Sequence, residues 1–155
     1  MEIKIKIEGL DELISAFEKA PDKMVNELEK AVKKTLLTIQ SNSIKEAPAN
    51  KEIGQGARLR QSFFIRMENK LSGVLYNRQP YALYVHEGTR PHEIRPKNKK
   101  VLANRRTGQL FGKVVQHPGT RPNPFFVRAI ERSKNIIQKN FDDVIKAVQA
   151  TFPKS

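Results

Sequence analysis

The first third of the chain combines a strand-like and a helix-like spacing of apolar residues. Apolar side chains alternate with charged ones over residues 1–8, which predicts a half-buried strand. The spacing becomes helical over residues 10–17 and again from Asp22 to about Glu46. Pro21 suits the first turn of the second helix, and Pro48 lies just past its end. We therefore expect a strand, a short helix and then one long amphipathic helix.

The remaining two thirds contain several short strand patterns and one more long helical pattern. In chain order we expect a polar loop over 49–57, strands over 59–68 and 71–77 joined near 69–70, one or two helical turns over 80–86, β segments over 101–103 and 110–115 around a loop at 105–108, and a helix over 126–148. No strand–helix–strand alternation occurs, so a doubly wound fold is not expected. The pattern predicts an α+β fold, with an antiparallel sheet packed by a long N-terminal amphipathic helix and a long C-terminal helix. A basic β-hairpin arm, about 90–117, should protrude from it.

Length and composition limit the class of protein. With 155 residues, we expect a single domain over 1–155. The absence of cysteine excludes a disulfide scaffold, a thiol nucleophile and a Cys-ligated metal site. No stretch approaches the ~20 apolar residues of a membrane span, and the charged N-terminus is not that of a secretory signal. A soluble protein with no membrane partner is expected.

Positive charge is concentrated in the middle of the chain. The net charge is +13, and residues 57–134 carry 17 basic and 4 acidic residues. Residues 90–121 contain nine basic residues and a single acidic one, Glu93. A solvated face normally mixes both signs. The segment therefore indicates an acidic partner, namely nucleic acid, an anionic membrane surface or an acidic protein surface, although plain solubility charge also explains it.

One hexapeptide occurs twice and brackets this basic segment. Residues 86–91 (HEGTRP) and 117–122 (HPGTRP) match at five of six positions. One interpretation is that two similar turns form the base of the arm. The other is that similar turn chemistry arose independently, since Pro118-Gly119 is also the pair found at the centre of a type II turn. An arm of this length is a binding or docking element in the first interpretation.

Candidate catalytic and metal-binding residues are few. His86, Glu87, His92 and His117 lie in turn-rich segments, and Arg90 stands where a zincin helix needs its second histidine. Neighbouring arginines oppose a cation, and carboxylates are scarce in the middle of the chain. We expect no catalytic residues, no metal site and no cofactor, and therefore not an enzyme. A small hydrolase or toxin using His86, Glu87 or His117 is the disfavoured alternative.

A nucleic-acid interface is also weakly marked. Tyr76, Tyr81 and Tyr84 have rings that stack on bases in other proteins, but they do not interleave with the basic cluster. We interpret them as half-buried core residues. No zinc-finger, RNP or GxxG motif is present. Non-specific electrostatic contact with nucleic acid through residues 90–121 remains an alternative function.

Several segments together resemble one known family, the tail-component, or tail-completion (neck), proteins of long-tailed bacteriophages and prophages. The blocks that carry the resemblance are 81–89 (similar to YA-x-x-V-E-x-G-T), 96–102 (PKNKKAL), 111–120 (FAK-x-V-x-HPGT), 123–126 (PFF) and 47–62 (AP…TG-x-L-R-x-S). The order and spacing agree over roughly residues 10–150. Two positions depart from the family pattern: the acid of the first block stands one place later, at Glu87, and Ala57 replaces the usual glycine.

The resemblance implies a virion structural protein of the neck. Such a protein completes the tail or joins it to the head as a ring around the DNA channel, made in the host cytoplasm and retained in the virion. Its implied partners are copies of itself and other neck and tail proteins. We expect assembly contacts from Glu87, Gly88, Thr89, Arg90, Lys97, Lys99, Lys100, Arg105, Arg106, Lys113, His117, Pro118, Gly119 and Thr120.

Overall fold

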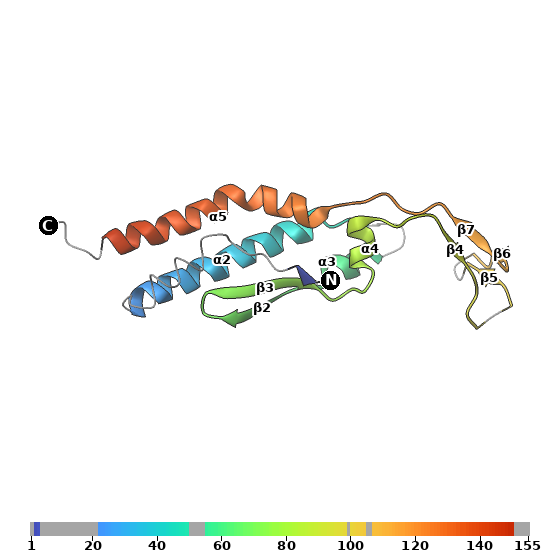
Figure 1. Ribbon diagram of the computed structural model, residues 1–155, viewed down its shortest axis with the longest axis horizontal. Helices are drawn as coiled ribbons and strands as arrows, with labels where there is room; N and C mark the ends of the chain where they lie inside the picture. Colours follow the sequence, from blue (N-terminus) through green and yellow to red (C-terminus); the bar gives the residue numbers. More distant parts are fainter. Residues whose placement is uncertain (1, 4–21, 50–54, 99, 105–106, 151–155) are drawn as a thin grey trace. The chain divides into compact units, whose positions relative to one another are not determined.

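The computed structural model describes residues 2–3, 22–49, 55–98, 100–104 and 107–150 (Figure 1). The chain divides into two compact units, which we describe separately: residues 1–82 with 125–155 form the first unit, and residues 83–124 form the second. The expected helix over 10–17 and most of the expected N-terminal strand lie outside the described residues. So does part of the expected loop, residues 50–54.

Two long helices dominate the first unit. Helix α2 (Asp22–Glu46) and helix α5 (Phe125–Gln149) each contain 25 residues and lie side by side (Figure 1). Both coincide closely with the amphipathic patterns in the sequence. Their apolar stripes bury side chains that include Leu28, Leu36 and Ile39 on α2 and Phe126 and Ala129 on α5. Burial of these stripes, rather than helix propensity, accounts for most of the stability of such helices.

Polar side chains also meet between the two helices. The Asn42 amide donates to Ser133 Oγ at 2.9 Å, and the Asn140 amide donates to Thr35 Oγ1 at 3.2 Å. On each helix, the two residues that form these bonds are seven positions apart, so the two bonds are separated by about two helical turns. Ser133 and Asn140 are almost fully buried. Because a buried polar group without a partner is costly, these bonds favour a single alignment of the two helices.

An ion-pair network joins the end of α2 to the start of α5. Glu46 accepts a hydrogen bond from Nε of Arg128 and forms an ion pair with Nε of Arg132, both at 2.9 Å. The hydrogen bond from Arg128 is the main reason why the pKa of Glu46 is lowered, and the charge of Arg132 adds to it. The network holds the neighbouring ends of the two helices together while most of the Arg132 side chain stays in water.

A three-stranded antiparallel sheet packs on α2. Strands β1 (Glu2–Ile3), β2 (Phe63–Asn69) and β3 (Ser72–Asn77) are ordered β1-β3-β2. One face of the sheet meets α2, because a Cβ atom at Gly73 would lie 2.5 Å from Leu36 Cδ1. On the same face, the Phe63 ring makes edge contacts with the rings of Phe125 and Phe126. The expected hairpin and the α+β class are confirmed.

The end of the expected loop, residues 55–57, and the start of the strand expected at residue 59 are wrong. Residues Gln55–Arg60 form a short helix, α3, and β2 begins only at Phe63. Leu59 is buried, and its carbonyl accepts a hydrogen bond from the Asn77 amide at 2.8 Å. Arg60 Nε donates to the carbonyl of Ala47 at 2.8 Å. These contacts with distant residues fix the helical turn, and the local sequence pattern does not contain them.

The second unit consists of short elements arranged as nested pairs. They are α4 (Ala82–Glu87, with its first residue in the first unit), β4 (His92–Ile94), β5 (Leu102–Ala103), β6 (Leu110–Gly112) and β7 (Val115–His117). β4 pairs with β7 and β5 pairs with β6, both antiparallel. The short helix and β5 were expected, whereas the single segment expected over 110–115 is divided into two strands with different partners.

Candidate functional site

The two hexapeptide copies pair with each other at the base of the nested strands. Thr89 N donates to the Thr120 carbonyl at 3.0 Å, and Thr120 N donates to the Thr89 carbonyl at 3.1 Å. Their hydroxyl oxygens are 3.0 Å apart. The repeats therefore form one paired structure, which agrees with the first interpretation of the repeat. We call residues 88–91 with 118–121 the crossing.

Glycine is required at two positions of the crossing. Gly88 and Gly119 have φ angles of 75° and 85°. A Cβ atom on Gly88 would lie 2.5 Å from the Thr120 carbonyl oxygen, and one on Gly119 would lie even closer to the Thr89 carbonyl oxygen. Each glycine thus allows the backbone of the other repeat to approach it. Gly119 has the positive φ that the centre of a type II turn requires. The N–H of Thr120, however, donates to the Thr89 carbonyl of the other repeat.

The pairing continues from the crossing into β4 and β7 without a change of register. Thr89 is opposite Thr120, and His92 is opposite His117. Pro91 and Pro118 lie between these pairs and have no N–H group for the ladder. The side chains of His92 and His117 stack, with ring centroids 5.0 Å apart and planes inclined by 29°. In the sequence, His92 stands out only as a possible metal ligand, whereas the constant register of the ladder pairs it with His117.

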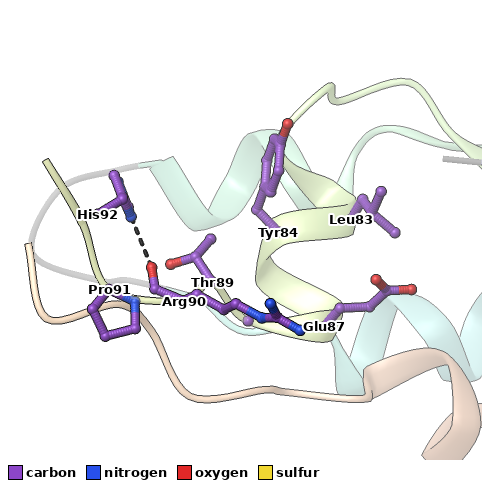
Figure 2. A pocket seen from close by; sticks show the side chains of 8 residues that line it. Leu83, Tyr84, Glu87, Thr89, Arg90, Pro91 and His92 are labelled. Carbon is purple, nitrogen blue, oxygen red and sulfur yellow. Dashed lines mark hydrogen bonds between the residues drawn. The ribbon is translucent and has the colours of Figure 1, made fainter. Parts of the chain in front are cut away.

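Hydrogen bonds give the two stacked imidazoles opposite roles. The backbone N of Gly119 donates to Nδ1 of His117 at 3.0 Å, so this nitrogen acts as an acceptor. Nδ1 of His92 lies 2.9 Å from the Arg90 carbonyl, which can only accept, so this nitrogen acts as a donor (Figure 2). Both rings are tied to the backbone of the crossing and help to hold its shape.

The expected basic assembly residues are exposed where the structure describes them. Arg90, Lys97, Lys100 and Lys113 are all exposed, and no contact joins them into one cluster. Arg95 forms a 2.6 Å ion pair with Glu93, on its own strand segment. Three further expected residues, Lys99, Arg105 and Arg106, lie outside the described residues.

The second unit has no buried residue among those that the structure describes between 83 and 124. Large apolar side chains are instead open to solvent: Leu110 is 68% exposed, Phe111 46% and Val114 40%. Successive side chains of a strand point to opposite faces, so Leu110 and Phe111 leave both faces of β6 uncovered. Two-stranded ladders without an apolar core are at best marginally stable in water.

A groove of about 620 Å³ lies beside α4, within the second unit. Figure 2 shows the side chains that line this groove. Three of them come from α4 (Leu83, Tyr84 and Glu87), and Arg90 and His92 belong to the extended chain that follows α4. Tyr84 is 60% exposed, so the expectation that it is a half-buried core residue is wrong. The groove therefore combines apolar surface with one acidic and one basic side chain, and its lining includes four of the expected assembly residues, Glu87, Gly88, Thr89 and Arg90.

No group of three or more potential metal ligands occurs among the residues that the structure describes. Within the same residues, no helix has both the length and the hydropathy needed to span a bilayer. Comparisons with protein families, with characterised proteins and with solved structures find no match to this chain.

Proposed function

We propose that this chain is a ring-forming structural subunit of a phage neck, which completes the tail or joins it to the head. The observation that carries the proposal is the state of the second unit: its backbone is paired, yet none of its described residues is buried. Exposed apolar side chains on both faces of β6 gain stability only when another surface covers them. Such a unit is suited to docking.

A ring provides that second surface naturally. In a ring, one patch of each subunit meets a different patch of the next. The second unit carries nine basic and two acidic residues, whereas residues 1–56 carry 9 basic and 10 acidic ones. The arm (residues 90–117) therefore differs in charge from the N-terminal third, which supports a contact between unlike surfaces of neighbouring copies, or between the arm and the tail tube.

Microscopy of an induced lysate tests the role in assembly. In a strain that lacks this gene, we expect filled heads and separate tails. Normally joined particles in that lysate would contradict the proposal. Complementation with the wild-type gene on a plasmid should restore joined particles.

Charge reversal in the arm tests which part of the chain makes the contact. The variant with Lys99, Lys100, Arg105 and Arg106 changed to Glu should fold but fail to restore joining. The matched control reverses two exposed lysines of α5, Lys139 and Lys146, and should complement normally. Equal complementation by both variants would remove the arm from the proposal.

Non-specific binding of nucleic acid through residues 90–121 is the alternative function. Its support is the excess of basic residues there, together with the exposure of those that the structure describes. Salt distinguishes the two functions. A protein that contacts six to ten phosphates should lose roughly three to five decades of affinity between about 50 and 200 mM salt. Weak binding with no defined site size would favour the assembly role.

A further inference from the structure

The face of the three-stranded sheet that points away from α2 carries an unusual group of side chains. Strand alternation places Phe64 and Arg66 on this face, because Phe63 and Gly73 belong to the face that meets the helices. Tyr76 is directly opposite Phe64 in the register. Tyr76 is half-buried, as the sequence predicted, but it lies outside the packed layer between sheet and helix.

Aromatic rings and guanidinium groups alternate across this face. The rings of Phe64 and Tyr76 have centroids 6.0 Å apart. The guanidinium carbon of Arg78 lies 4.1 Å from the Phe64 centroid and 6.0 Å from the Tyr76 centroid. Arg66 reaches Tyr76 from the other side, at 5.9 Å. We call Phe64, Arg66, Tyr76 and Arg78 the platform.

The platform is accessible at one end of the sheet. Arg78 is exposed and the Arg66 side chain is 57% exposed, whereas Phe64 and Tyr76 are half-buried. Val74, which is opposite Arg66 in the register, is buried, so the face is covered beside Arg66. Two carboxylates belong to this face: Glu68 lies 3.7 Å from Arg66, and Glu2 on β1 is opposite Tyr76 in the register. The platform therefore presents two rings and two cations beside two carboxylates.

We propose that the platform binds single-stranded nucleic acid by stacking unpaired bases. Exposed antiparallel sheets with aromatic side chains are suited to this, because bases stack on rings and on guanidinium planes while the positive charge attracts the phosphates. Arg78 lies over the Phe64 ring and is exposed, and Tyr76 supplies a second, half-buried ring. A protein of net charge +13 attracts the polyanion to this surface. The site lies in the first unit and does not depend on the arm or on the neck assignment.

The test compares oligonucleotides with and without bases, using the full-length chain. Fluorescence anisotropy measures the affinity for a labelled 20-mer of dT and for a 20-mer of abasic sites with the same phosphates. Wild type should bind dT more tightly by about 5- to 150-fold for each stacked base. Tyr76→Leu keeps an apolar side chain but has no ring, so it should remove most of this difference. Tyr76→Phe should retain it.

Charge and stacking are separated by the salt dependence. Tyr76→Leu removes no phosphate contact, so the slope of log K against log salt should stay unchanged. Tyr84→Leu, at an exposed tyrosine in the second unit, is the matched control and should behave as wild type. Arg78→Lys preserves the charge but removes the planar guanidinium group. It should lower the preference for dT while the slope of log K against log salt stays unchanged. This variant provides a second test if Tyr76→Leu does not fold. Comparison with a 20-mer of U assigns the site to DNA or to RNA, and either supports it.

Three results would overturn the proposal. The first is equal affinity of wild type for the dT and abasic 20-mers. The second is an equal loss of affinity for both oligonucleotides in Tyr76→Leu. The third is unchanged oligonucleotide binding by Tyr76→Leu with weaker self-association in sedimentation velocity, which would assign the face to a protein interface. None of these results alters the expected phenotype of the gene deletion, so the two proposals fail separately.

Discussion

Replacement of Gly119 by alanine should open the crossing at the base of the arm. The new Cβ would meet the Thr89 carbonyl oxygen and would lie 3.0 Å from Pro91 N. These are backbone atoms, so no side chain can rotate away to make room. The matched control is Gly108→Ala, because Gly108 also has a positive φ, of 71°, but a Cβ there meets nothing within 4 Å.

The two substitutions share one cost and differ in the other. A non-glycine residue with this φ costs roughly 1–2 kcal/mol in either place. At Gly119, relief of the contact also requires the two backbone bonds between Thr89 and Thr120 to lengthen. Each such bond contributes about 0.5–1.5 kcal/mol net. We therefore expect local destabilisation of about 2–5 kcal/mol for Gly119→Ala and about 1–2 kcal/mol for Gly108→Ala.

Amide hydrogen exchange measures this difference where it arises. Thr89 and Thr120 amides should exchange faster in Gly119→Ala than in Gly108→Ala, by a factor of about 5–150. Thermal melting of the buried helix pair should change little in either variant, because the affected bonds lie in the second unit. Equal protection of these two amides in both variants would refute the reasoning that the close approach requires glycine.

Three further predictions concern the first unit. Phe126→Ala should destabilise the protein by about 3–5 kcal/mol in urea unfolding, because the ring is fully buried. Asn140→Ala should cost roughly 1–3 kcal/mol by leaving Thr35 without its partner, and adding Thr35→Val should recover part of that loss; a purely additive double variant would contradict this. Glu46→Gln should lower the melting temperature at pH 7. Since the pKa of Glu46 is lowered in the folded state from 4.5, its contribution is complete above about pH 4.5 and is lost as the pH falls through the lowered value, so the two melting curves should converge in acid.

The spacing of apolar residues along the chain is sufficient to predict the long elements. A helix of 25 residues repeats its apolar spacing for about seven turns, so the bounds of α2 follow from the pattern and the flanking prolines. The turn between β2 and β3 and the start of α5 follow in the same way. For these elements, the residues that decide the structure are neighbours in the chain.

The short elements and both candidate sites depend on contacts between residues that are distant in the chain. Helix α3 depends on contacts of Leu59 and Arg60 with distant residues, and six residues carry too little periodicity to reveal it. The hexapeptides have the same local chemistry whether they turn separately or pair, and only the bonds between Thr89 and Thr120 distinguish the two. Likewise, Tyr76 lies beside Phe64 only because the strand register sets it there. Local patterns fix what each segment is, whereas long-range pairing fixes which side chains meet.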